Sequence, residues 1–185
     1  LKLYKPRTLY LYNRIKFFLF PFVKLEMLVP KKGFIIDLGC SPGGWSQVAS
    51  KIITQGRILA VDINYMEEIK NVKFLKGDFS DIKIYEKICN YFDEKVDVII
   101  SDMAANTSGN KDLDSYRTGE LCLEAMNLSK KIMRHDGILV CKMFMGGIFG
   151  EINEKANKYF KKVVKYKPLS SRKESKEIYF YCKGI

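Results

Sequence analysis

From residue 34 onward, short apolar runs alternate with segments whose apolar residues recur at helical spacing. The apolar runs are continuous, which is typical of strands buried on both faces of a parallel sheet. This alternation predicts an α/β fold with a mostly parallel, seven-stranded sheet and helices on both of its faces. The predicted strands are 34–38, 57–62, 72–75, 96–100, 138–142, 163–166 and 177–181, and the predicted helices are 46–53, 82–92, 113–133 and 148–160. His135-Asp136-Gly137 predicts a turn before the fifth strand.

Polar side chains stand at the ends of successive predicted strands: Asp37, Asp62, Asp78, Asp102 and Lys142. In parallel sheets, ligands bind beyond the carboxyl ends of the strands. Each of these residues alone is compatible with a helix cap or a surface charge. Five of them at successive strand ends predict a binding or catalytic site at that edge.

A glycine-rich segment, Asp37-Leu38-Gly39-Cys40-Ser41-Pro42-Gly43-Gly44-Trp45, follows the first predicted strand. Its glycines allow close approach of a ligand to the backbone, but their spacing is not that of the dinucleotide-binding GxGxxG motif. A carboxylate at Asp62 can accept hydrogen bonds from both ribose hydroxyls of an adenosine, as in NAD or S-adenosylmethionine. Asp78 can accept from an adenine amino group, or it can cap the helix predicted from residue 82.

The chain has 32 basic and 21 acidic residues, a net charge of +11. Residues 1–33 carry 8 basic and 1 acidic side chains, and residues 151–185 carry 10 and 4. One interpretation is an ordinary solvated surface. The other is a surface for a polyanion such as RNA, built from both ends of the chain. We therefore expect a basic, aromatic-rich RNA-binding arm at 1–33 and a main domain at 34–185.

Several classes of protein are disfavoured by composition. The five cysteines have no CxxC spacing and there is one histidine, which excludes a zinc cluster and argues against a disulfide framework and a Ser-His-Asp hydrolase. No metal is therefore expected, and a reducing compartment is favoured. The apolar run 17–23 is too short to span a bilayer, which needs about 20 residues. We expect this run to pack on the main domain, with no membrane association.

Six motifs occur in order: DLGCSPGGW, VD, GDF, SDMA, CKMF and SSRKESKEIY. Together they resemble those of the FtsJ-type 2′-O-ribose methyltransferases of large-subunit ribosomal RNA. The resemblance covers about residues 34–185 and implies a Rossmann-like methyltransferase fold with S-adenosylmethionine as methyl donor. It implies a uridine ribose in large-subunit (23S-type) ribosomal RNA as substrate, within the large subunit or its precursor. A cytoplasmic monomer is expected.

The resemblance also implies roles for individual residues. The cofactor-binding positions are Gly43, Trp45, Asp62, Asp78 and Asp102. Three members of a catalytic Lys-Asp-Lys-Glu tetrad correspond to Asp102, Lys142 and Glu177. The stretch that should supply the first lysine, residues 6–12, contains none. Lys16 lies near the expected distance before the first strand, and Lys24 has the better local match. The sequence leaves open whether Lys16, which we favour, Lys24 or neither completes the tetrad.

Other functions fit parts of the pattern. The same chemistry on tRNA or on an mRNA cap would use the same residues. A non-catalytic RNA-binding or ribosome-assembly protein would explain the missing lysine. An NAD-dependent oxidoreductase fits Asp62 but fits neither the glycine spacing nor the basic ends.

Overall fold

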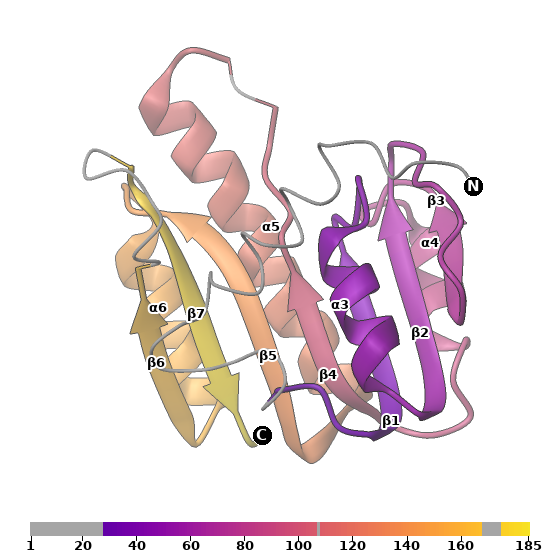
Figure 1. The fold of residues 1–185 in the computed structure, drawn as a ribbon. Coiled ribbons are helices and arrows are strands. Elements are labelled where there is room, and N and C mark those ends of the chain that lie inside the picture. Colours follow the sequence, from indigo (N-terminus) through magenta and orange to yellow (C-terminus); the bar gives the residue numbers. More distant parts are fainter. Residues whose placement is uncertain (1–27, 107, 168–174) are drawn as a thin grey trace.

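The computed structural model describes residues 28–106, 108–167 and 175–185, and its centre is a seven-stranded sheet (Figure 1). The strands are β1 (Lys32–Leu38), β2 (Gln55–Asp62), β3 (Val72–Lys76), β4 (Val96–Ser101), β5 (Met133–Phe144), β6 (Lys162–Tyr166) and β7 (Glu177–Lys183). The helices between them are α3 (Gly44–Ile52), α4 (Ile82–Cys89), α5 (Lys111–Ile132) and α6 (Phe149–Tyr159). The predicted fold class is confirmed.

The strand order is β3-β2-β1-β4-β5-β7-β6. The first five strands are parallel, whereas β7 is inserted antiparallel between β5 and β6. The carboxyl ends of β1 to β5 therefore meet at one edge of the sheet. Because β7 runs in the opposite direction, its first residues lie at that same edge.

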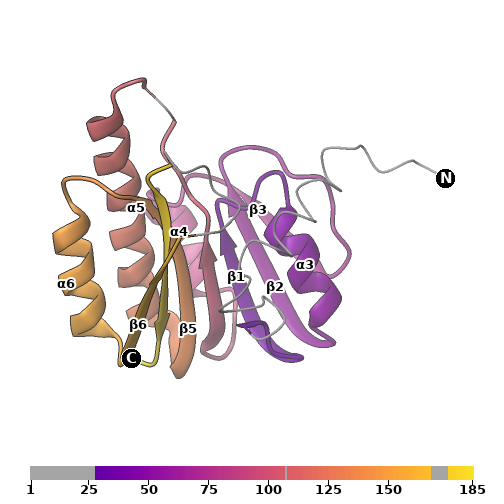
Figure 2. The ribbon, with the colours of Figure 1, turned by 60° about the vertical axis from the view of Figure 1, so that its left-hand side comes forward.

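Two apolar layers hold the helices against the sheet. Figure 2 shows α3 on one face and α4, α5 and α6 on the other. Ile35 packs in the layer on the α3 side, and its neighbour Ile36 packs in the layer formed with Met126 of α5. Successive strand residues point to opposite faces, so a strand buried on both sides must be apolar throughout. This explains the continuous apolar runs in the sequence.

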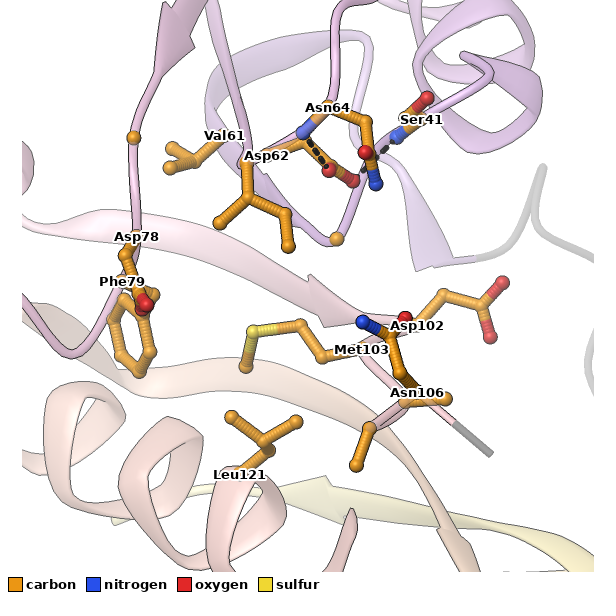
Figure 3. Close-up of a pocket in the computed structure, with 15 residues that line it drawn as sticks. Ser41, Val61, Asp62, Asn64, Asp78, Phe79, Asp102, Met103, Asn106 and Leu121 are labelled. Carbon is orange, nitrogen blue, oxygen red and sulfur yellow. Dashed lines mark hydrogen bonds between the residues drawn. The ribbon is translucent and has the colours of Figure 1, made fainter. Parts of the chain in front are cut away.

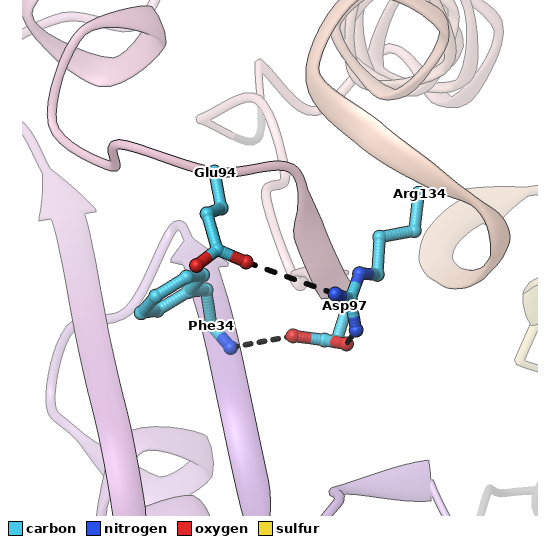
Figure 4. Close-up of polar contacts among 4 residues, drawn as sticks. All are labelled: Phe34, Glu94, Asp97 and Arg134. Carbon is cyan, nitrogen blue, oxygen red and sulfur yellow. Dashed lines mark hydrogen bonds and ion pairs between the residues drawn. The ribbon is translucent and has the colours of Figure 1, made fainter.

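The opposite edge of the sheet is fastened by a polar cluster (Figure 4). Asp97 of β4 accepts a hydrogen bond from the Phe34 backbone N–H of β1 at 2.7 Å and pairs with Arg134 of β5 at 2.8 Å. Arg134 also lies 3.8 Å from Glu94. These contacts join three neighbouring strands, so the charged residues at this end of the strands have a structural role in holding the sheet together.

Two predicted elements differ from the structure. The predicted helix 82–92 ends at Cys89, where the backbone N–H of Asn90 caps it by donating to Glu86. The predicted turn at 135–137 is wrong, because these residues lie inside β5. Along β5, Val96 pairs with Met133 but Val98 pairs with Ile138. The extra residues on β5 form a bulge there, and a bulge tolerates the Asp-Gly pair that suggested a turn.

The predicted arm falls largely outside the described residues, and so do the run 17–23, Lys16 and Lys24. Leu28 and Val29, the first described residues, are buried in the apolar layer on the α3 side. The division at residue 33 therefore stays a prediction. Within the described part of the chain, no helix is both long and apolar enough to cross a membrane.

Candidate active site

A cavity of about 330 Å³ opens at the carboxyl ends of β1 to β4 (Figure 3). Its volume is within the range of small-molecule sites. Its walls combine carboxylates, backbone and apolar side chains: Gly39, Ser41, Val61, Asp62, Ile63, Asn64, Gly77, Asp78, Phe79, Asp102, Met103, Ala104, Ala105, Asn106 and Leu121. The structure thus brings together three of the predicted cofactor residues, Asp62, Asp78 and Asp102.

Asp62 ends β2, and its carboxylate is fixed by the backbone on both sides. One oxygen accepts from the Ser41 N–H at 2.8 Å, and the other accepts from the Asn64 N–H at 2.7 Å. Each carboxylate oxygen has further lone pairs that can accept hydrogen bonds. Asp62 therefore presents a preoriented acceptor to the cavity, as recognition of a pair of neighbouring hydroxyls requires.

Asp78 follows β3 by two residues and lies at the far end of the cavity from Asp102 (Figure 3). Its side chain accepts from the Ser80 hydroxyl at 2.6 Å and the Ser80 N–H at 2.9 Å, and these bonds lower the pKa of the carboxyl. The helix cap proper is Asp81, which accepts from Lys83 N–H. Because Asp81 caps α4, Asp78 remains available as an acceptor beside the apolar wall of Phe79.

Gly39 lets the backbone after β1 pass close to the loop after β4. Its φ is +72°, and a Cβ at this position would come within 2.8 Å of Met103. A larger residue would therefore clash with Met103, which lines the cavity. By contrast, Gly43 and Trp45 do not line the cavity formed by the described residues. Gly43 precedes α3, and Trp45 is buried with its ring 6.3 Å from that of Tyr179. Their cofactor role stays a prediction.

A charged cluster lies beside the cavity, where β4, β5 and β7 meet. The Lys142 ammonium lies 2.8 Å from the Asp102 carboxylate. The Tyr179 hydroxyl contacts the same carboxylate oxygen of Asp102 at 2.7 Å and Glu177 at 3.1 Å. Lys142 and Tyr179 are partners in the β5–β7 ladder, which fixes their spacing. The structure thus brings the three predicted catalytic residues into one network.

Asp102 belongs to both parts of the site. Its backbone is tied to β1, because its N–H donates to the Leu38 carbonyl at 3.0 Å. Figure 3 shows its carboxylate directed away from Asp62 and Asp78. That side chain reaches the Lys142 network, while the residue lines the cavity. One residue therefore joins the cavity to the charged cluster.

One residue of the site was not foreseen from sequence, and another lies deeper than expected. Tyr179 bridges two carboxylates, and its pKa is raised well above the usual value by burial and then by Asp102 and Glu177. Its position two residues after Glu177, hence on the same strand face, was the signal available. Asp37 was expected at the strand end but is fully buried beneath the site, where it accepts from the Ser46 hydroxyl at 2.6 Å. Desolvation raises the pKa of Asp37 to about 7, although the hydrogen bond from Ser46 lowers it.

No metal centre accompanies these groups in the part of the chain that the structure describes, since no three His, Cys, Asp or Glu side chains are grouped to bind one.

Comparison with known proteins gives consistent results. Residues 20–185 match the family described as FtsJ-like methyltransferase. The chain is 51% identical over 149 residues to the ribosomal RNA large subunit methyltransferase E of Pelagibacter ubique, an alignment that spans 80% of this chain and 73% of the relative. Two solved structures are similar as well. A ribosomal RNA methyltransferase structure from Plasmodium falciparum has a TM-score of 0.69 and 29% identity, covering 83% of this chain and 86% of that one. Human methyltransferase-like protein 13, solved with SAH, has a TM-score of 0.62 over 96% and 79% of the chains, and its 13% identity supports the fold alone.

Proposed function

The chain belongs to the FtsJ-like methyltransferase family and is an S-adenosylmethionine-dependent RNA methyltransferase, and we propose that it methylates the ribose 2′-hydroxyl of a uridine in large-subunit ribosomal RNA. The observation that carries this proposal is the ion pair between Lys142 and Asp102 beside a cavity lined by Asp62 and Asp78. Asp102 both lines the nucleoside-sized cavity and pairs with the Lys142 ammonium. That arrangement suits transfer of a group from a bound cofactor to a second substrate.

The cavity has the donor and acceptor chemistry that S-adenosylmethionine requires. Asp62 would accept from the two ribose hydroxyls, because its carboxylate is already oriented by Ser41 and Asn64. Asp78 would accept from the adenine amino group, with Phe79 as an apolar wall beside the base. Gly43 and Trp45 are proposed to support the cofactor indirectly, through the loop after β1. When bound, the cofactor supplies an electrophilic methyl group on a sulfonium.

The residues of the charged cluster would orient the ribose oxygen. A hydroxyl is a poor nucleophile, so holding its oxygen in line for attack is the main gain. The Lys142 ammonium is held by Asp102, and in this position it can direct a lone pair of the hydroxyl oxygen along the line of attack. Tyr179 keeps Asp102 and Glu177 at fixed positions. Asp102, Lys142 and Glu177 therefore form a preorganised electrostatic setting for the hydroxyl, in which the carboxylates of Asp102 and Glu177 are the groups that can accept its proton.

The partner proposed for this site is ribosomal RNA within the large subunit or its precursor, with the enzyme acting as a cytoplasmic monomer. The relatives named as large-subunit methyltransferases support this choice of RNA. The net charge of +11 supports a polyanionic substrate. Light scattering of the purified chain tests the monomer, and a mass twice that of the chain would contradict it.

The decisive experiment maps the product. Purified protein is incubated with methyl-labelled S-adenosylmethionine and, separately, with undermethylated large subunits, deproteinised large-subunit RNA, tRNA and capped RNA. Nuclease digestion and mass spectrometry should find 2′-O-methyluridine from the ribosomal substrates. If the label appeared only in tRNA or only in the cap, that RNA would be the substrate in place of ribosomal RNA. Binding of ribosomal particles without any transfer would support the non-catalytic alternative.

A further inference from the structure

One edge of the sheet carries an unusual concentration of lysine. Residues 155–167, which cover the end of α6, the turn after it, β6 and the residue that follows, contain six lysines and no acidic residue. At the other edge of the sheet, residues 62–78 contain three lysines and four acidic residues. Both segments include an edge strand. The first segment therefore has an excess of positive charge, and the second does not.

Five of these lysines form no ion pair with an acidic side chain of the described residues. Lys158, Lys161, Lys162 and Lys165 are exposed, and Lys155 is half-buried. None of these five lies within ion-pair distance of an acidic side chain in the described part of the chain, where the four ion pairs are all elsewhere. Lys165 donates to the Asn153 side chain at 3.0 Å, and Lys155 lies 5.7 Å from the Tyr159 ring centroid. Lys161 contacts the His135 ring and the Ile185 oxygen.

Edge protection explains only part of this pattern. A charged side chain on an edge strand discourages pairing with another sheet, and one or two lysines on β6 would serve that purpose. Here lysines also occupy α6 and the turn at Lys161, where there is no edge to protect. Like charges this close repel one another, and a bound polyanion would relieve that repulsion.

The strand pairing connects the outermost strand, β6, to the charged cluster of the active site. Tyr166 of β6 pairs with Tyr179 of β7, and Tyr179 pairs with Lys142 of β5. Neighbouring strands are about 4.8 Å apart, so β6 lies roughly 10 Å from the strand that holds Lys142. Since β6 is parallel to β5, its carboxyl end lies beside the active site, whereas its first residue, Lys162, and the end of α6 lie toward the opposite ends of the strands, so the lysines lead away from the site. Figure 1 shows β6 as the outermost strand on this side.

We propose that the β6 edge and the end of α6 bind the sugar–phosphate backbone of the substrate RNA on one side of the methylated nucleotide. The inference rests on the proposed function, because it assumes an RNA substrate at Lys142. Lysines spaced along α6 and β6 would contact successive phosphates and set the direction in which the RNA leaves the site. Phosphate contacts of this kind position the substrate without reading its sequence.

The test compares two matched pairs of lysines. Lys162→Gln/Lys165→Gln removes two exposed lysines from β6, and Lys70→Gln/Lys73→Gln removes two exposed lysines with the same spacing at the β3 edge. For the first pair, the slope of log K for RNA against log salt should become shallower by about 1.5. Each phosphate contact contributes roughly 0.7 to 0.9 to this slope, and two contacts are lost. The RNA concentration for half-maximal methyl transfer should rise. The single-turnover rate at saturating RNA and the S-adenosylmethionine affinity should stay at wild-type values.

A third variant separates RNA binding from edge protection. Lys162→Glu/Lys165→Glu keeps the edge strand charged, so it should stay monomeric, but it should bind RNA more weakly than the glutamine pair. Wild-type salt dependence in the β6 variants, an equal effect in the β3 pair, or wild-type RNA binding by the glutamate pair would each overturn the inference. Failure of the wild-type protein to methylate any RNA would instead overturn the proposed function, because the comparison of slopes does not depend on turnover.

Discussion

The buried carboxyl of Asp37 should make the stability of this protein depend on pH in a way that one substitution removes. Desolvation raises the pKa of Asp37 from 3.8 to about 7 in the folded chain, and Asp102 and Asp62 raise it further against the Ser46 hydrogen bond. The folded state therefore retains a proton that the unfolded state has lost. Stability from this group is fully present below pH 3.8 and is lost as the pH rises to about 7.

The size of the effect follows from the shift. At about 1.4 kcal/mol per pKa unit, the full loss of unfolding free energy is about 4 kcal/mol, of which about 2 kcal/mol falls between pH 5 and 6.5. In Asp37→Asn the side chain keeps its shape and the acceptor for Ser46, but it cannot ionise. Relative to this variant, the wild-type protein should lose stability steadily up to about pH 7, and the difference should then stay constant.

Urea unfolding measures this directly, because Trp45 is the only tryptophan and is buried beside Tyr179. Free energies of unfolding of both proteins are compared at about six pH values from 5 to 8.5. Ser46→Ala serves as a second variant, since removing a bond that lowers the pKa of Asp37 should extend the pH window upward. A difference between wild type and Asp37→Asn that does not change from pH 5 to 7.5 would refute the reasoning.

Three further predictions concern binding and turnover. Asp62→Ala should abolish S-adenosylmethionine binding in calorimetry while the protein remains folded, since Asp62 lies at a solvent-facing strand end; undiminished affinity would remove it from the site. Lys142→Ala should retain cofactor affinity and lose single-turnover methyl transfer by orders of magnitude, as expected when a contact to the reacting group is removed, and a near-normal rate would exclude its catalytic role. RNA affinity of the wild-type chain should fall with salt with a slope near −4 if roughly five of the 18 basic residues in the two ends neutralise phosphates, whereas a flat response would make the charge ordinary surface.

The positions of the first five strands in the sequence and the place of the site could be predicted because both follow from local pattern. Continuous apolar runs indicate strands buried on two faces, and polar residues that end parallel strands must meet at one edge. Asp62, Asp78 and Asp102 lie together for this reason. The bulge in β5 could not be predicted, because its Asp-Gly pair carries the same local signal as a turn.

Contacts that depend on β7 were harder to foresee. Tyr179 reaches Asp102 because β7 runs antiparallel beside β5, a pairing that nothing local to either strand specifies. Trp45 shows the opposite case. The family resemblance implies a cofactor role for it, which stays a prediction, and the structure places its large apolar ring, at the second position of a helix that packs on the sheet, in the core. The helix face, set by the packing of α3, determined its position.

The first lysine of the tetrad stays a prediction, because Lys16 and Lys24 both precede the described residues. Leu28, the first described residue, belongs to the same apolar layer as Tyr179 of the charged cluster. Lys24 is four residues earlier and can lie up to ~14 Å away, and Lys16 up to ~40 Å. We expect Lys16→Ala to lose turnover at saturating RNA and Lys24→Ala to keep it, because roughly 20 residues of helix and turn are needed to return from the site to Asp37. A selective loss in Lys24→Ala would reverse the assignment. Full activity in both variants would mean that neither lysine reaches Lys142 and that the basic arm serves RNA binding only.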